Sequence, residues 1–321
     1  MLKSNRGRYG AAVFFITVIT AAIIIGGHNI YREKWTIPES GEIRAFEDDE
    51  PKPLEAPFYP TFETVSRIIT MEDKLEYLYT VDETAYVLPE QLDIQGFLKM
   101  DLSAELKSGN PKILIFHTHS RETFIDSRDG EDEDTVIGLG SLLANILADE
   151  FHIPVIHDVG RYDMENGKEK REGSYERMSR GVGGLLKKYP SIEITIDLHR
   201  DGVPDNVRLV QDINGVPTAK MMFFNGITCL NENGGPKPMP ELPNPYLHEN
   251  LALSLQLQLT ANGLYPGLMR QIYIKPYRYS LFLKPKSMLV EVGANTNTVA
   301  EAMNAMRPLA QILTSVLQSS D

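Results

Sequence analysis

The sequence contains one cysteine, Cys229, among 321 residues. One cysteine cannot form a disulfide within the chain, so an ordinary packed core must hold the fold in any compartment. It also excludes a structural zinc site built from several thiolates. An excess of basic residues is absent as well, because the net charge is -12 and the pI is about 5.1. Binding to nucleic acid requires a positive surface, so we expect no nucleic-acid partner.

Hydrophobic runs are short in most of the chain, with an exception near the N-terminus. Residues 9–27 carry no charge and would form a helix of about 28 Å, close to the roughly 30 Å of a bilayer core. Basic residues precede them, which predicts a cytoplasmic tail over 1–8 and a transmembrane anchor over 9–27, with the rest outside the cytoplasm. A cleaved signal peptide is the alternative, but its apolar region would be shorter, about 7 to 15 residues.

Three further segments follow this predicted anchor. Residues 28–63 are rich in acids and prolines and have little apolar periodicity, which indicates a disordered tether. Apolar residues return over 64–108 and predict a juxtamembrane stalk or docking region with helical pieces. From 109 to 321 short apolar runs alternate with amphipathic stretches, which is typical of an α/β fold with a mixed sheet flanked by helices. We expect the catalytic domain there.

Within this domain the apolar patterns predict six strands and four helices. The strands are expected at 113–116, 155–157, 192–197, 207–212, 221–224 and 288–292, and the helices at 137–150, 174–188, 247–262 and 298–317. The stretch 231–245 is dense in proline and glycine and is predicted to be a surface loop.

Side chains able to bind a metal follow the first predicted strand. The segment His117-Thr-His-Ser-Arg-Glu122 begins where strand 113–116 ends, and the carboxyl ends of strands are where α/β sheets usually bind ligands. On a helical turn His119 and Glu122, three residues apart, would be neighbours able to face one ion. His117 is five residues from Glu122 and fits less well, so we assign it to a supporting position or a substrate contact.

Two more strands add polar residues. Asp197 and His199 come at the end of strand 192–197, where alternate residues share a face, so Asp197 can accept a hydrogen bond from His199 and fix its tautomer. Glu291 interrupts the apolar strand 288–292, and a buried carboxylate needs a partner or a task. Arg177 on helix 174–188 and Arg200 beside His199 are further candidates for supporting or substrate contacts.

Two histidines and a carboxylate that leave one position open match the ligand set of catalytic zinc. His119, Glu122 and His199 are therefore the predicted ligands of one Zn²⁺, and Glu291 would take a proton from water during attack on a carbonyl. This describes hydrolysis of an amide or peptide bond. Simpler explanations are a hydrogen-bonded turn at His119, an ion pair within His199-Arg-Asp and an arginine partner for Glu291.

Four motifs in a fixed order resemble the stage II sporulation protein P family over roughly residues 100–318. They are ILIFHTHSRETF (113–124), GSYERMSR (173–180), IDLHRDG (196–202) and LVEVGANTNTVAEA (289–302). One departure is Tyr279-Ser-Leu, where relatives tend to carry Tyr-Asn-Gln and where a substrate contact is expected to differ.

The resemblance implies a fold similar to zinc-dependent N-acetylmuramoyl-L-alanine amidases and, more distantly, to zinc carboxypeptidases. It implies zinc ligands at His119, Glu122 and His199 and a catalytic acid/base at Glu291. The expected substrate is peptidoglycan, cut between N-acetylmuramic acid and L-alanine, with cross-link endopeptidase cleavage as a second activity.

The resemblance also implies a single-pass protein of the sporulation septum that acts with stage II sporulation proteins D and M during engulfment. Two alternatives stay open. One is a zinc endopeptidase acting on stem peptides, and the other is a septal scaffold that binds wall material without cutting it.

Overall fold

The computed structural model describes residues 59–63, 77–107 and 109–318. The predicted cytoplasmic tail, the predicted anchor and most of the predicted tether lie outside the described residues. Within the described part, no helix has both the length and the apolar character needed to cross a bilayer.

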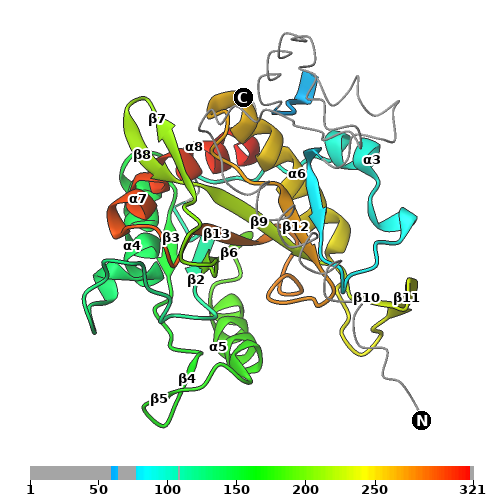
Figure 1. The fold of residues 1–321 in the computed structure, drawn as a ribbon, viewed down its shortest axis with the longest axis horizontal. Coiled ribbons are helices and arrows are strands. Elements are labelled where there is room, and N and C mark those ends of the chain that lie inside the picture. The colour runs from blue at the N-terminus through cyan, green and yellow to red at the C-terminus, as the bar shows by residue number, and fades with distance from the viewer. Residues whose placement is uncertain (1–58, 64–76, 108, 319–321) are drawn as a thin grey trace, which may run out of the picture. The chain divides into compact units, whose positions relative to one another are not determined.

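A seven-stranded mixed sheet forms the centre of the fold, as the α/β prediction expected (Figure 1). In spatial order its strands are β1 (Tyr79–Val81), β12 (Ile272–Lys275), β9 (Met221–Gly226), β13 (Ser287–Ala294), β6 (Ile194–Asp201), β2 (Ile113–Phe116) and β3 (Val155–His157). All neighbours are parallel except β9 and β13, which are antiparallel.

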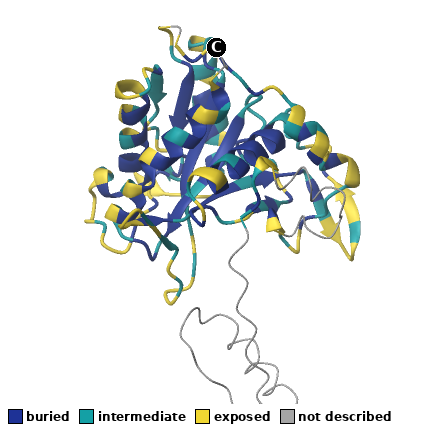
Figure 2. Cartoon of the chain, turned by 90° about the horizontal axis from the view of Figure 1, so that it is seen from above, coloured by how far each residue is buried: buried dark blue, intermediate teal, exposed yellow. Residues whose placement is uncertain are grey.

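Helices cover both faces of the sheet. The face packed against α4 (Val136–Asp149), α6 (Leu247–Leu264) and α8 (Met306–Leu317) carries the larger core, whereas α5 (Ser174–Lys188) lies on the other face (Figure 1). Figure 2 shows the strands buried and the outer helix surfaces exposed. The short helices are α3 (Ile94–Lys99), α7 (Val299–Asn304), η2 (Pro89–Gln91) and η3 (Asp132–Asp134).

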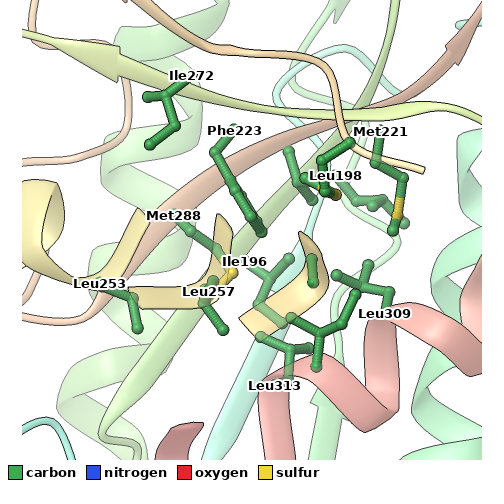
Figure 3. Close-up of a cluster of buried hydrophobic side chains, with 14 of the residues drawn as sticks. Ile196, Leu198, Met221, Phe223, Leu253, Leu257, Ile272, Met288, Leu309 and Leu313 are labelled. Carbon is green, nitrogen blue, oxygen red and sulfur yellow. The ribbon is translucent and has the colours of Figure 1, made fainter. Parts of the chain in front are cut away.

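The alternation of side chains along a strand decides which face each residue occupies. Ile196 and Leu198 of β6 are fully buried in the larger core, together with Met288 of β13 and side chains of α6 and α8 (Figure 3). The alternate residues of β6 and β13 therefore point to the opposite face of the sheet. That places Asp197, His199 and Glu291 on the side of α5.

Three β-hairpins project from the central sheet. They pair β4 (Met164–Glu165) with β5 (Lys168–Glu169), β7 (Val210–Ile213) with β8 (Val216–Ala219), and β10 (Cys229–Glu232) with β11 (Gly235–Pro238). The surface loop predicted at 231–245 is mostly exposed, as expected, but its first part is the β10–β11 hairpin and not a loop. The strand predicted at 207–212 lies in a hairpin and not in the central sheet.

Other boundaries differ from the prediction for local reasons. The helix predicted at 298–317 breaks at Ala305 into α7 and α8, because Pro308 has no N–H to donate to the carbonyl of Asn304. Strand β6 continues to Asp201, so Asp197 and His199 lie inside the strand and not after it.

The described residues of the predicted stalk region belong to this same fold. Strand β1 pairs with β12, and Phe97 of α3 is buried in the larger core. Residues 79–106 thus contribute one edge of the sheet and part of its core.

Candidate active site

Three neighbouring strands bring the candidate residues together. His199 of β6 and Glu291 of β13 are register partners on adjacent parallel strands, so their side chains lie side by side on the α5 face. His119 and Glu122 come from the turn after β2, which pairs with the other edge of β6. The imidazole centroids of His119 and His199 are 5.4 Å apart. All four residues line one cavity of about 260 Å³.

The segment from His119 to Glu122 is a tight turn and not a turn of helix. A buried aspartate, Asp163, holds its backbone. The Ser120 hydroxyl donates to Asp163 Oδ1 at 2.6 Å, and the Arg121 N–H donates to Oδ2 at 3.0 Å. The helical geometry predicted for this pair was therefore wrong, although both side chains face the same cavity.

Asp197 fixes the orientation of the His199 ring. His199 Nε2 donates to Asp197 Oδ1 at 2.8 Å, because an ionised carboxylate can only accept. The Thr118 N–H and hydroxyl also donate to this carboxylate, at 2.8 and 2.7 Å. With Nε2 occupied by the proton, Nδ1 of His199 faces Glu122 Oε2 at 3.2 Å.

A neutral His199 would place the lone pair of Nδ1 against the carboxylate of Glu122. This contact needs a positive charge between the two atoms, supplied either by a proton or by a metal ion. Burial opposes protonation of His199, but the charges of Asp197 and Glu122 outweigh it and raise the imidazole pKa well above its usual value. Burial likewise opposes ionisation of Glu122, and His199 reverses the effect, so the pKa of that carboxyl is lowered.

Two polar atoms at this cavity are buried without a hydrogen-bond partner among the described residues: His119 Nδ1 and Glu291 Oε2. Burial lowers the pKa of His119 to about 4, with the charge of His199 adding to the effect, so this ring is neutral at pH 7. Burial also raises the pKa of Glu291 to about 8; the nearby Glu122 adds to the rise and His199 opposes it. Unpartnered buried polar atoms are rare and call for an explanation.

A zinc ion fits this donor set. Two ligands of a tetrahedral zinc, each about 2.0–2.1 Å from the metal, lie about 3.3 Å apart, and the 3.2 Å between His199 Nδ1 and Glu122 Oε2 agrees. In the part of the chain that the structure describes, however, no three His, Cys, Asp or Glu side chains are already gathered at metal-ligand spacing. Binding of a metal ion would therefore require side-chain adjustment, and His119 Nδ1 has no hydrogen bond to the described residues to break.

His117 does not line the cavity, and the substrate contact that was one of its two predicted roles stays a prediction. Its side chain is fully buried, Nδ1 donates to the carbonyl of Leu198 at 2.9 Å, and Nε2 lies 2.9 Å from Nε2 of His157. His117 thus supports the backbone directly before His199, which corresponds to the supporting position that was the other prediction.

Arg177 is also placed differently from the prediction of a substrate contact. Its guanidinium donates to the carbonyls of Tyr162 at 2.6 Å, of Glu172 at 3.0 Å and of Lys170. Arg177 therefore braces the loop before α5 and does not line the cavity.

Two other arginines do line the cavity. Arg171, which the sequence analysis missed, places Nη2 3.1 Å from Glu122 Oε1. Arg200 donates its backbone N–H to Glu122 Oε2 at 3.0 Å and its Nε to the carbonyl of Thr123 at 2.9 Å. Arg171 lies in an irregular loop, where no periodicity marks a residue as important.

Aromatic rings form one wall of the cavity and were not predicted. Tyr175 packs edge-on to His119 with 5.8 Å between ring centroids, and Tyr279 lies 5.6 Å from Tyr175 and 4.7 Å from Phe224. Tyr279 has a positive φ of 51°, a conformation that non-glycine residues adopt rarely and that often marks a functional site.

Comparison with protein families identifies the chain. The family model of stage II sporulation protein P (SpoIIP) matches residues 53–314. The chain belongs to this family. The match begins well before residue 100, so it includes part of the predicted tether and the region that contributes β1 and α3. No curated protein sequence matches the chain.

Solved structures similar to this chain include three amidases. The CwlD amidase of Clostridioides difficile, solved with the GerS lipoprotein, is 16% identical and has a TM-score of 0.38. The match covers 64% of this chain and 99% of the CwlD chain. Ami1 of Mycobacterium abscessus, an N-acetylmuramyl-L-alanine amidase, is 13% identical and has a TM-score of 0.36. The match covers 64% of this chain and 95% of Ami1. The catalytic domain of CwlV from Bacillus (Paenibacillus) polymyxa var. colistinus, an N-acetylmuramoyl-L-alanine amidase, is 10% identical and has a TM-score of 0.34. The match covers 63% of this chain and 93% of the CwlV domain.

Proposed function

We propose that the chain is a membrane-anchored peptidoglycan hydrolase that cleaves the amide between N-acetylmuramic acid and L-alanine, using one Zn²⁺. The observation that supports it most is the meeting of His119, Glu122 and His199 with Glu291 at one cavity. Membership of a sporulation family supports a role in wall remodelling at the sporulation septum. The uncharged run 9–27 supports a single-pass anchor, and proteins D and M of stage II are the proposed partners.

His119, Glu122 and His199 would hold the ion. A bound Zn²⁺ supplies Lewis acidity, which polarises a carbonyl and makes water a stronger nucleophile at neutral pH. Asp197, held by Thr118, keeps Nε2 of His199 protonated, so Nδ1 would be the atom that binds the ion. The pKa of Glu291 near 8 applies to the cation-free site, and a nearby divalent cation would lower it and favour the carboxylate needed for catalysis.

Glu291 moves the proton. Its Oε2 accepts a proton from the attacking water while the new C–O bond forms at the lactyl carbonyl. Glu291 then delivers this proton to the nitrogen of L-alanine as the C–N bond breaks, and the second proton of the water stays on the new carboxyl group. At neutral pH the carboxyl group loses it and the amine takes it up, so the products are a lactyl carboxylate and the ammonium group of L-alanine. Arg171 lines the same cavity, so we assign to it the stabilisation of negative charge on the carbonyl oxygen.

The test is digestion of purified sacculi by the full chain, purified in detergent without chelator, followed by mass analysis of the products. Free glycan strands and peptides that begin with L-alanine support the amidase. Intact lactyl-peptides with cut cross-links would indicate the endopeptidase, and binding without release would indicate the scaffold.

Glu291→Gln is expected to retain zinc but to lose muropeptide release by roughly 10²- to 10⁴-fold, the usual range for loss of a general acid/base. The matched control is Glu105→Gln, an exposed residue outside the cavity, which should keep full activity. Full activity in Glu291→Gln would remove this residue from the mechanism.

A further inference from the structure

A second and larger cavity adjoins the candidate active site. Its volume is about 530 Å³, and we call it the arginine pocket. It is lined by Tyr175, Glu176, Ser179, Arg180, Leu242, Tyr277, Arg278, Tyr279 and Phe282. Tyr175 and Tyr279 also line the cavity that contains Glu291. A ligand whose reacting bond lies beside Glu291 can therefore continue past these two rings into the arginine pocket.

The pocket carries two guanidinium groups and one carboxylate. Arg180 is exposed and forms no hydrogen bond or ion pair with the rest of the described chain. Arg278 stacks over the ring of Phe282 at 3.9 Å, and its Nη1 donates to the carbonyl of Pro243 at 3.0 Å. These contacts hold the Arg278 side chain in place and leave further N–H groups to donate. Glu176 is the single acidic side chain of the lining.

A local excess of positive charge is notable in a chain whose net charge is -12. Arginine binds carboxylates through paired N–H donors and is the usual residue where planar anions are recognised. The tyrosine rings add apolar contact area. Uncharged sugar rings would gain from stacking on these tyrosines but would leave both guanidinium groups without a counter-charge. The lining therefore favours an anionic peptide over a glycan strand.

We infer that the arginine pocket binds the stem peptide of the substrate, with Arg180 and Arg278 receiving its carboxylates and Glu176 available for a side-chain amine. This inference rests on the proposed function, because it names the substrate part that lies next to the bond cut beside Glu291. Arg180 and Arg278 then determine specificity without touching the reacting atoms, and their loss affects binding of peptide-bearing substrates more than turnover.

The first test measures binding of the free tripeptide L-alanyl-γ-D-glutamyl-diaminopimelate to the full chain in detergent by calorimetry. The wild type is expected to bind it, and to bind the form with amidated carboxylates at least about tenfold more weakly, as expected when charged hydrogen bonds are lost. Arg180→Ala and Arg278→Ala should each weaken binding by a similar factor, and Arg180→Lys should weaken it less. Lys187→Ala, an exposed cation on the same helix, is the matched control and should bind as the wild type does.

The second test compares hydrolysis of N-acetylmuramoyl-tripeptide with that of N-acetylmuramoyl-L-alanine amide, which has no stem carboxylate. The wild type should favour the tripeptide substrate through a lower KM. Arg180→Ala should lose this preference, whereas the control Lys187→Ala should keep it and should keep the wild-type kcat/KM on the short substrate. Thermal unfolding of each variant shows whether it is folded.

Two outcomes would overturn the inference: tripeptide binding that does not respond to amidation or to either arginine variant, and peptide-free glycan binding that Arg180→Ala abolishes. Failure of the proposed function would look different. In that case the wild type would cleave neither substrate, while the binding experiment would still report on the pocket.

Discussion

Asp197 is the residue on which the orientation of His199 depends. Its carboxylate is fully buried, accepts from His199 Nε2 and receives two more hydrogen bonds from Thr118. Carboxylates in this position behind a metal-bound histidine typically contribute a factor of 10 to 100 to metal affinity.

We therefore expect Asp197→Asn to lower zinc affinity by about 10- to 100-fold, because the amide can turn its donor towards His199 and disturb the tautomer. Competition with a chelator of known affinity measures the effect. Asp205→Asn, at an exposed position, is the control. Equal affinities for Asp197→Asn and the wild type would show that this hydrogen bond does not tune the site.

The residues of the candidate site were predictable to different degrees. Glu291 and His199 stood out because polar side chains in an apolar strand are costly unless they have a task. Arg171 and Tyr279 carried no such signal, since both lie in loops. Arg177 was chosen because it lies on a helix near a motif, but its contacts with three carbonyls are set by a loop whose path only the folded chain defines.

Among the elements, α4 packs closely against β3 and the residue after β2 at Gly140. A Cβ added there would lie 2.5 Å from His157 Nε2 and 2.7 Å from His117 Nε2. Real Cβ atoms do not approach other atoms so closely, so the paired histidine rings would have to move. These rings support the backbone before His199, and α4 therefore depends on glycine at this point.

Gly140→Ala is expected to lower the free energy of unfolding by about 1–3 kcal/mol through overpacking. Gly183→Ala on α5 is the matched control, because its added Cβ meets nothing within 4 Å. That control should raise stability by roughly 0.5–1 kcal/mol, the gain in helix propensity from glycine to alanine. Urea unfolding followed by circular dichroism measures both, and a neutral Gly140→Ala would contradict the close packing.

The edge strand β1 is attached to β12 by an acidic residue. Asp82, directly after β1, accepts from Tyr273 at 2.6 Å and pairs with Lys275 at 2.7 Å, and both partners lie on β12. Partial burial opposes ionisation of Asp82, but Lys275 and the hydroxyl and backbone donors outweigh it, so the carboxyl pKa is held below its usual value.

This lowered pKa predicts a pH dependence of stability. A folded-state pKa below the unfolded value of about 3.9 stabilises the fold fully above that pH, and the contribution is lost as the pH falls through the folded pKa. Asp82→Asn should therefore be less stable than the wild type at pH 7, by a margin that shrinks below about pH 4. Urea unfolding of both proteins from pH 7 to pH 2.5 tests this, and a constant margin would contradict it.

The three hairpins have a turn signal in the sequence that the prediction of strands did not use. Each of the three turns is an Asn-Gly pair with positive φ at both positions: Asn166-Gly167, Asn214-Gly215 and Asn233-Gly234. Asn-Gly is the strongest short-range signal for a two-residue hairpin turn. Strands 113–116 and 155–157 and helix 174–188, by contrast, were predicted with the bounds that the structure has, because their apolar periodicity is strong and local.

At the scale of the whole molecule, the candidate site joins β2, β6 and β13 in the middle of the sheet. A ligand that binds only the folded state stabilises it by mass action, by about 2.7 kcal/mol when its concentration is 100 times Kd. Zinc bound at this position should therefore stabilise the entire described domain.

We expect added zinc to raise the thermal midpoint of the wild type and excess chelator to reverse the rise. His119→Ala should lose this increment, because it removes one ligand. His248→Gln is the control, since this histidine on α6 contacts the carbonyl of Glu90 and not the cavity. Differential scanning calorimetry measures the shift, and an equal rise in His119→Ala would exclude His119 as a ligand.

Local patterns in the sequence predicted the α/β class, several strands and helices, and the four candidate residues His119, Glu122, His199 and Glu291. These follow from local periodicity and from polar residues in apolar segments, which act over a few neighbouring positions. The folded chain alone shows that His199 and Glu291 are register partners, that Arg171 and not Arg177 lines the cavity, and that the arginine pocket adjoins it. Those relations join residues tens to more than a hundred positions apart, and long-range packing, which leaves no local pattern, sets them.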